Sequence, residues 1–296
     1  MDWQDQLIAV YLFVCKEYAQ ELGHYITRLS NHSNLEFSDE EVITIYLFGV
    51  MSGHSRVKSI YGYIARHLKN WFPALPSYVA FIQRLNKVSH LFELLVSKLV
   101  ASFGAYHQEL PLLMDSLPII LAHRGRRFKA CVARQIASSN GYCATKKLHY
   151  YGVKLHFVGK YKVGSLPLPV ILGTTEAGRG DIKVLEAIQP DIPENSRLFA
   201  DKAYQTGNEP VANKEAFTLF TPVKKQKGQN MLDSADRLLS STISSVRQPV
   251  ESFFNWIEEK TKIQIASKVR SFEGLMVHIY GKLAAAFFIL QSSFCS

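Results

Sequence analysis

The chain has 296 residues, of which 47% are hydrophobic and 20% are charged, and this ordinary globular composition excludes a largely disordered chain. Its formal net charge of +9 is unevenly distributed: residues 1–50 sum to −6, residues 51–90 to +6 and residues 111–296 to +10. Nucleic acid is the simplest polyanionic partner for such basic segments. A solvated basic surface without a partner is the alternative that charge alone leaves open.

The cysteines and the apolar segments limit the cellular setting. None of the four cysteines has C-x-x-C spacing to another, which disfavours a zinc knuckle or a redox motif, and a core of this size does not need disulfides. The opening stretch MDWQDQL is acidic, unlike a secretory signal, and the apolar run Leu283–Leu290 is too short to cross a bilayer. We therefore expect reduced thiols in a cytoplasmic protein that does not associate with membranes.

Residues 1–105 carry apolar side chains at helical spacing, and we expect an all-helical N-terminal domain there. Ser38 and Glu41 have the spacing of a capping box in front of an apolar run, and Ser77 is a suitable N-cap. The expected helices cover Trp3–Leu22, the run that follows the capping box, Ile60–Leu68, Tyr78–Val88 and Leu91–Phe103.

Residues 51–90 contain two of these helices, separated by Pro73 and Pro76, together with six basic side chains and no acidic one. A helix–turn–helix that reads DNA has this character, but its turn is normally shorter. A plain packing or dimerisation region fits the pattern equally well. We therefore expect the N-terminal domain to serve either DNA binding or dimerisation.

Residues 106–296 change to short apolar runs mixed with helical spacing, which indicates an α/β layer domain. Pro167 and Pro169 confine one of the strands to an edge of the sheet or to its own beginning. The expected strands are a buried one that ends at Asp115, Leu148–Val158, Leu166–Thr174, Arg197–Ala200 and Phe217–Val223. The expected helices are Asp181–Gln189, Ser245–Lys262 and Ser271–Ser292.

Three acids stand out in this second region. The segments LLMDS and LFADKAY each place an aspartate, Asp115 and Asp201, just past a short apolar strand. A carboxylate at such a position needs a compensating partner, and a metal ion is one. The third acid, Glu251, follows Arg247 by four residues, so that both side chains project from neighbouring turns of one helix face. Pro249 indicates that this helix begins nearby, with Glu251 just inside its first turn.

Carboxylate oxygens are hard ligands that suit Mg²⁺ or Mn²⁺. Two such ions clamp the attacking and the leaving oxygen of an in-line phosphoryl displacement, and this chemistry needs acids rather than a covalent nucleophile. His149 and His156 lie on opposite faces of one expected strand and lack the spacing of zinc ligands.

Five segments occur in the order that is typical of a known family: LLMDSLPI, GYCATKKLHYYGVKLHFV, LPVILGTTEAGRGD, LFADKAYQ and SSVRQPVESFFNWIEEKT. They span about Leu112–Ile265 and resemble insertion-sequence DDE transposases, most closely the insertion-sequence family 982 type. The resemblance implies an RNase H-like mixed sheet flanked by helices in residues 106–296, after the helical domain of residues 1–105. It also implies that Asp115, Asp201 and Glu251 are the catalytic acids.

The resemblance further implies a reaction and its partners. Water would cleave the phosphodiesters at the transposon ends, and the freed 3′-OH would join target DNA, with two Mg²⁺ or Mn²⁺ ions held by the three acids. The partners would be the terminal inverted repeats and target DNA, bound by a homodimer on paired ends. The setting would be the bacterial cytoplasm, in association with the nucleoid.

The sequence departs from related families at a few positions. Ser244 and Glu258 stand where relatives carry a tyrosine and a lysine, and Gly180 stands where a histidine is frequent. The short segment between Asp201 and Glu251 has no room for the large inserted subdomain that some relatives use to protect a hairpin intermediate. A hairpin route is therefore not implied.

Basic side chains near the acids are expected to contact DNA phosphates without reading sequence. For each cluster, an ordinary solvated loop is the alternative. The residues are Arg124, Arg126, Arg127, Lys146, Lys147, Lys154, Lys202, Arg247, Lys260 and Lys262.

Two other functions remain open at this point. One is a DNA-binding protein derived from a transposase that has lost its chemistry, which the presence of all three acids disfavours. The other is a hydrolase that uses an acid pair, for example on glycosides, which the net charge of +9 disfavours.

Overall fold

The computed structural model describes residues 2–26, 36–103, 111–144, 146–205, 210–213, 217–225, 228–229 and 231–294. The chain forms two compact units, one made of Met1–Ser102 with Ile257–Ser296 and the other of Phe103–Trp256. The last segment of the chain thus groups with the N-terminal helices. The functional division at residues 105 and 106 stays a prediction, and the two units are described separately.

The unit Phe103–Trp256 is built on a mixed sheet flanked by helices, which confirms the expected α/β class. Within the described residues the sheet has seven strands, with β4 beside β3 and the others in the order β2, β3, β1, β5, β7, β6. They are β1 (Leu112–His123), β2 (Asn140–Cys143), β3 (Leu148–Lys160), β4 (Leu168–Glu176), β5 (Ser196–Ala200), β6 (Val211–Asn213) and β7 (Phe217–Phe220).

The central strand β1 pairs antiparallel with β3 and parallel with β5, and β5 pairs parallel with β7. Among the described strands β4 pairs, antiparallel, with β3 alone, so it forms an edge, one of the two positions that its prolines predicted. Gly152 is required where β3 passes β1, because a Cβ there would lie 2.0 Å from the carbonyl oxygen of Ile119. The short strands β2 and β6 were not predicted, since each has only three or four residues.

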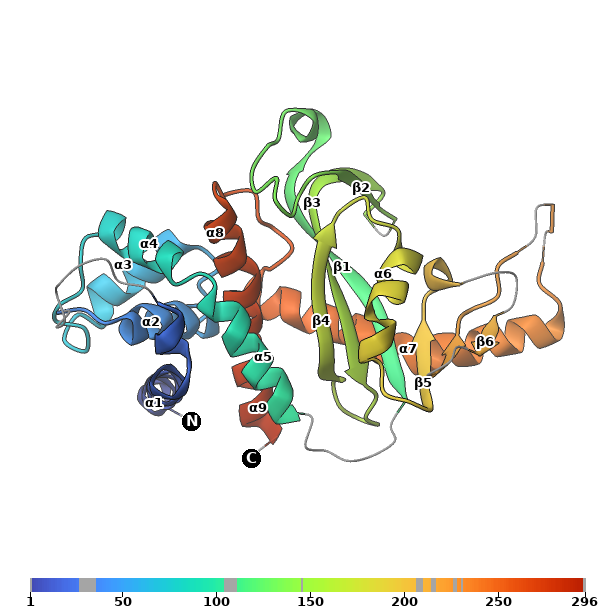
Figure 1. Ribbon diagram of the computed structural model, residues 1–296, viewed down its shortest axis with the longest axis horizontal. Coiled ribbons are helices and arrows are strands. Elements are labelled where there is room, and N and C mark those ends of the chain that lie inside the picture. The colour runs from blue at the N-terminus through green and yellow to red at the C-terminus, as the bar shows by residue number, and fades with distance from the viewer. Residues whose placement is uncertain are drawn as a thin grey trace. The chain divides into compact units, whose positions relative to one another are not determined.

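Helices cover both faces of this sheet. α6 (Asp181–Ile188) packs Val184 and Leu185 into a core with Met114 and Val158 of the central strands. α7 (Ser234–Thr261) packs Phe253 on the other face, with its ring 4.3 Å from that of Phe157. Figure 1 accordingly shows α6 in front of the sheet and α7 behind it.

Two predictions about the acid-bearing segments are wrong in detail. Asp115 does not end its strand, because β1 continues to His123 while it pairs with β3. α7 begins at Ser234, so Pro249 lies in the helix interior rather than in a first turn. The carbonyl that Pro249 leaves without an N–H donor belongs to Ser245, which is exposed and therefore accessible to water.

The other unit is helical. Its N-terminal part has α1 (Trp3–Gln20), α2 (Asp39–Met51), α3 (Val57–His67), α4 (Tyr78–Lys87) and α5 (Leu91–Phe103, whose last residue is assigned to the other unit). Its C-terminal part runs through α8 (Phe272–Met276), the π-helical turn Val277–Gly281 and α9 (Lys282–Phe294). These bounds confirm the expected helices of both segments.

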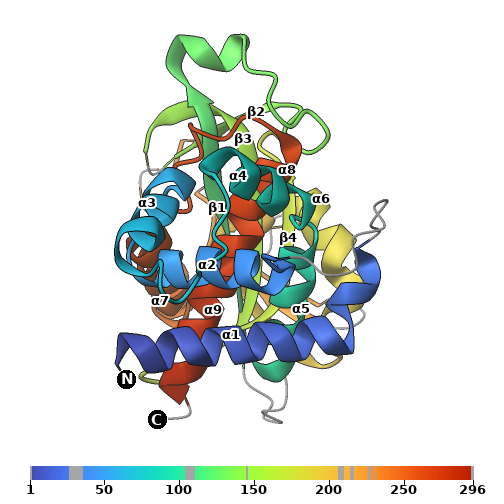
Figure 2. The same cartoon turned by 90° about the vertical axis from the view of Figure 1, so that its left-hand side faces the viewer.

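Helix α2 is the centre of this unit, because its residues from Val42 to Val50 are buried on every side. It contacts α1, α3, α4 and α9, and it lies between α1 and α4 in both views (Figures 1 and 2). The predicted capping box begins it: the Glu41 N–H donates to Ser38 Oγ at 3.2 Å, and the Ser38 N–H donates to the Glu41 carboxylate at 2.6 Å. The predicted cap at Ser77 also forms, at 3.4 Å from the Ala80 N–H.

One described helical stretch, Phe272–Ser292, has the length and mean hydropathy, 1.4, of a membrane-spanning helix. Most of that stretch, 78%, is buried inside the protein, where for example Phe288 packs on Phe13 of α1. Burial in the core of the helical unit therefore accounts for its apolar character. Cys15, Cys131 and Cys143 are free thiols, and Cys295 lies outside the described residues.

Candidate active site

The strand register brings the two predicted aspartates to neighbouring positions. Met114 of β1 is the partner of Ala200 of β5 in the parallel ladder, and each is followed directly by an aspartate, Asp115 or Asp201. Adjacent strands of a sheet lie about 4.8 Å apart, so the two carboxylates leave the sheet side by side. Each also accepts a backbone hydrogen bond from the residue that follows it, at 2.7 Å for Asp115 and 2.8 Å for Asp201.

Arg247 of α7 joins these two carboxylates. Its guanidinium lies 2.9 Å from an oxygen of Asp115 and 3.9 Å from an oxygen of Asp201. The arginine is only 7% exposed, and its Nε atom has no hydrogen-bond partner among the described residues. Arg247 therefore supplies a buried positive charge that is shared by the acid pair.

Asp115 is poorly compensated in spite of this arginine. Burial, with smaller contributions from the charges of Asp201 and Glu251, raises the pKa of its carboxyl to about 6, although Arg247 and the Ser116 N–H act in the lowering direction. The ionised form of this carboxylate is thus less stable in the folded protein than it would be in water. A cation bound at this position would relieve that penalty.

Glu251 lies one helical turn after Arg247 and is exposed. It is close enough for its charge to raise the pKa of Asp115, and no described residue forms an ion pair with it. Within the described part of the chain, however, no three His, Cys, Asp or Glu side chains are close enough to hold one metal ion together. The two aspartates are paired, and the glutamate stands near them without completing a three-ligand cluster.

A second polar group, on the sheet face that α6 covers, was not predicted. His156 is 3% exposed, its Nε2 lies 2.8 Å from Thr175 Oγ1, and its Nδ1 has no partner among the described residues. Burial lowers the pKa of this imidazole to about 4, so it is neutral. Tyr204 is also buried there, and burial together with nearby carboxylates raises its pKa. The alternation of LHYYGVKLHFV placed His156 on a strand, but only the sheet register shows what faces it.

Within this unit, the basic residues predicted to contact DNA fall into three groups. Arg247 and Lys154 have acidic partners within the protein, since Lys154 lies 3.0 Å from Asp181. Lys202 is exposed directly beside Asp201. The other predicted residues of this unit lie in two connections between strands. Arg124, Arg126 and Arg127 follow β1, where Arg127 lies over the exposed ring of Phe128, and Lys146 and Lys147 precede β3.

Lys260 and Lys262 belong to the helical unit. Lys260 lies 3.6 Å from Glu259, and Lys262 is exposed, with a positive φ of 53°. Glu258, where related families carry a lysine, accepts a hydrogen bond from the Gln264 N–H at 2.9 Å. Glu258 therefore stabilises the turn after α7.

A mixed sheet flanked by helices, with one acid on a central strand and another directly after its parallel neighbour, is consistent with the DDE class of transposase folds. Residues 111–288 match a family model described as the transposase DDE domain, and this match covers more than half of the chain. The chain therefore belongs to the transposase DDE domain family, and its function is that of a transposase. No curated protein and no solved structure matches it.

Proposed function

We propose that this protein is an insertion-sequence DNA transposase of the family 982 type that cleaves the phosphodiesters at transposon ends and joins the freed 3′-OH to target DNA. Asp115, Asp201 and Glu251 are its catalytic acids. The observation that carries the proposal is the pairing of Asp115 with Asp201 on adjacent parallel strands, with Arg247 between them and Glu251 one turn further along the same helix.

The strand order supports an RNase H-like fold for this unit. Three antiparallel strands, β4, β3 and β1, are extended by two parallel ones, β5 and β7, and helices cover both faces. The first acid then lies on the central strand and the second directly after its parallel neighbour. The carboxyl ends of parallel strands are where α/β sheets commonly hold their ligands.

The acid set fits two Mg²⁺ or Mn²⁺ ions, because carboxylates are the hard oxygen ligands that these ions prefer. The raised pKa of Asp115 supports the assignment, since burial and the neighbouring acids disfavour its carboxylate more than Arg247 favours it. When bound, such ions supply the Lewis acidity that activates an attacking oxygen and stabilises a leaving one. Asp115, Asp201 and Glu251 would hold them.

The residues of the chain have separable roles in this proposal. Arg247 holds both aspartates in place through its ion pairs, so it acts on the acids rather than on DNA. Lys202 and the exposed arginines Arg124 and Arg126 are available to phosphates, and so support binding to DNA backbones. We further propose that the protein works as a homodimer on paired ends in the bacterial cytoplasm, in association with the nucleoid.

The test is cleavage of a supercoiled plasmid that carries the ends of the element, in the presence of Mg²⁺. We expect Asp115→Asn, Asp201→Asn and Glu251→Gln each to reduce cleavage by on the order of 1,000-fold, while end binding in a mobility-shift assay is nearly unchanged. Asp191→Asn and Glu186→Gln are matched controls, because both residues are exposed acids outside the site.

A measurement of metal binding complements the activity. Mn²⁺ is expected to raise the melting temperature of the wild type and of both controls, and to raise that of Asp115→Asn much less. Cleavage that persists in any of the three acid variants would contradict the proposed roles. Binding of ends without cleavage by the wild type would favour the alternative, a catalytically silent protein derived from a transposase.

A further inference from the structure

The helical unit contains a cavity of about 690 Å³, within the size range of small-molecule sites. Helices α2, α3 and α4 line it together with the C-terminal segment from Lys262 to Lys282, so residues far apart in the chain form it. This cavity belongs to the helical unit alone. It is separate from the acidic site and has no role in the proposed chemistry.

The charge of the lining is one-sided. It includes six lysines and arginines and one histidine, and none of its described lining residues is acidic. Arg56, Lys58 and Lys268 are exposed and form no ion pair with a described residue. A cavity that gathers unpaired cations in this way is complementary to an anion. The basic lining residues are Arg56, Lys58, Lys262, Lys268, Arg270, His278 and Lys282.

Lys282 lies deepest among these cations. Its side chain is only 1% exposed, and its ammonium donates to the Lys262 carbonyl at 3.1 Å, the one hydrogen bond it makes among the described residues. An ammonium has three N–H donors, and leaving donors of a buried charge without acceptors is costly. An anion in the cavity would accept from the remaining donors.

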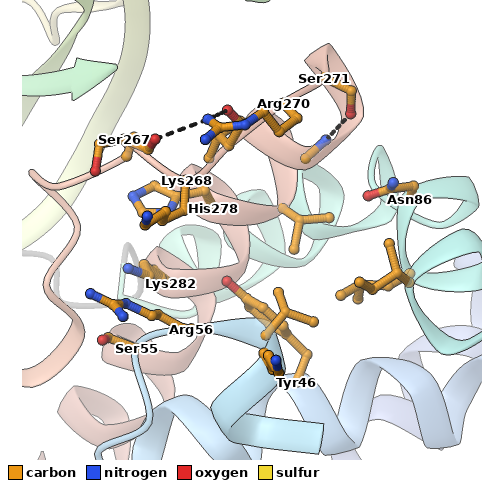
Figure 3. A pocket seen from close by; sticks show the side chains of 18 of the residues that line it. Tyr46, Ser55, Arg56, Asn86, Ser267, Lys268, Arg270, Ser271, His278 and Lys282 are labelled. Carbon is orange, nitrogen blue, oxygen red and sulfur yellow. Dashed lines mark hydrogen bonds between the residues drawn. The ribbon is translucent and has the colours of Figure 1, made fainter. Parts of the chain in front are cut away.

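The local helix geometry fixes this lysine. The turn before it, Val277–Gly281, is π-helical, and such turns are frequent at functional sites. Gly281 packs so closely on Tyr46 of α2 that a Cβ would lie 2.5 Å from its ring. Figure 3 shows Arg56, Lys268, His278 and Lys282 gathered on one side of the cavity, with the hydroxyl of Tyr46 directed toward them.

Beside a few serines and Asn86, the rest of the lining is largely apolar or aromatic, and a bare phosphate would not use that part. Tyr78, Ile82, Leu85 and Val277 contribute to this lining. A ligand that fits both parts carries a negative group at one end and a flat apolar body at the other. A nucleotide has this division, with a phosphate for the lysines and a base for the apolar wall.

We propose that this cavity binds a single nucleotide, with its phosphate on Lys282, Arg56 and Lys268 and its base against Tyr78, Ile82 and Leu85. The nucleotide is either a free mononucleotide or an unpaired residue at the end of a DNA strand, since both present the same chemistry. The site therefore adds a ligand-binding function to the helical unit of the transposase.

Calorimetric titration of the full chain at physiological salt tests the chemistry. Deoxyadenosine monophosphate is expected to bind at least tenfold more tightly than either deoxyadenosine or inorganic phosphate, because only the nucleotide uses both parts of the cavity. Equal binding of the nucleotide and inorganic phosphate, or no binding of the nucleotide, would overturn the proposal.

Variants locate the site. The double substitution Arg56→Gln with Lys268→Gln changes exposed residues, so it preserves the fold, and it is expected to weaken nucleotide binding at least tenfold. Lys282→Met is expected to weaken it further. Lys87→Gln is the matched control, because Lys87 is an exposed lysine on α4 that does not line the cavity. Equal affinities for the double variant and the control would also overturn the proposal.

A competition experiment distinguishes a free mononucleotide from an unpaired nucleotide at a DNA end as the natural ligand. A short duplex with one unpaired terminal nucleotide is added to the protein with bound mononucleotide, and a blunt duplex of the same sequence serves as the reference. Displacement by the tailed duplex alone, lost in the double variant, assigns the site to DNA ends. Displacement by neither duplex, with the mononucleotide still bound, assigns it to a free nucleotide. Equal displacement by both would mean that the cavity binds duplex phosphates and would overturn the proposal.

Discussion

The acidic site and the basic cavity each contain a buried ionisable group whose usual charge is disfavoured. Burial raises the pKa of Asp115 to about 6, and burial lowers the pKa of Lys282 to about 7. Both groups thus lower the stability of the folded protein in their charged forms. Such groups are concentrated at functional sites. Here the acidic site is complementary to a cation and the basic cavity to an anion.

The two sites differ in how the protein itself compensates the charge. Asp115 has an ion pair with Arg247 at 2.9 Å, whereas Lys282 has one carbonyl acceptor and only the more distant charge of Glu258. The acidic site can therefore be held together without a bound cation. The charge buried in the basic cavity depends more strongly on a bound ligand for its compensation. Substitutions at the two sites should measure this difference.

The largest expected effect is a separation of activities. Asp201→Asn should lower cleavage by on the order of 1,000-fold and leave the affinity for deoxyadenosine monophosphate within about twofold, because Asp201 belongs to the other unit. Plasmid cleavage and calorimetric titration of the same preparation measure both. A parallel loss of nucleotide affinity would show that the cavity and the acidic site are not independent.

Arg247→Gln is expected to have the next largest effect, a loss of cleavage of about 10- to 100-fold, because Arg247 positions two catalytic acids. Removing its charge also removes the main influence that lowers the pKa of Asp115. The acidic limb of the pH–rate profile should therefore move to higher pH. Arg247→Lys keeps the charge and should restore most of the profile, and an unshifted limb in Arg247→Gln would contradict the positioning role.

Lys282→Met should stabilise the protein where the lysine is charged. Because its pKa is about 7 when folded and 10.5 ordinarily, this group makes wild-type stability fall as pH drops from 10.5 to about 7 and level off below that pH. The methionine variant should be more stable than the wild type by about 2 kcal/mol at pH 6, and this difference should shrink toward pH 10.

Urea unfolding without nucleotide measures this change, with Lys87→Gln as the control for the loss of a surface lysine. Arg56, Lys268 and His278 line the same cavity, burial disfavours the charge of Lys282, and the carboxylate of Glu258 favours it. A methionine variant that is less stable at pH 6 would show that the hydrogen bond to Lys262 outweighs the burial of the charge.

Local patterns in the sequence predicted the local features of both units. The capping box at Ser38, the cap at Ser77 and the aspartate after β5 all follow from spacing within a few residues, and the structure confirms them. Local spacing predicts that Asp115 ends its strand, but β1 continues past it. That extension depends on pairing with β3, whose residues lie about 40 positions away in the sequence, so spacing within a few residues does not reveal it.

Long-range contacts explain what the sequence did not predict. The segment Ile257–Ser296 groups with the N-terminal helices, and the cavity exists only because of that association. Arg84 lies on α4, in the basic segment for which the sequence left a DNA-reading role open. Its guanidinium, however, binds Asp39 at 2.9 Å and the Phe37 carbonyl. Charge patterns show that cations are present, but partners contributed by other segments decide whether those cations are free.

The smallest expected effect is on the stability of the acidic site, and it measures how well Arg247 compensates Asp115. A carboxyl whose folded pKa is about 6 stabilises the folded state when protonated, and that contribution is lost as pH rises from about 4 through 6. Asp115→Asn should therefore be more stable than the wild type by about 1 kcal/mol at pH 7.5, and the two should converge at pH 4.

The gain should be smaller than that of Lys282→Met, because the asparagine also gives up the ion pair with Arg247. Urea unfolding of both variants at the same ionic strength and without divalent ions makes the comparison, with Asp191→Asn as the control. A gain at Asp115 as large as that at Lys282 would mean that Arg247 contributes little to compensating the aspartate. A loss of stability would mean that the ion pair outweighs burial, and the acidic site would then be stable as an ion cluster even before a metal binds.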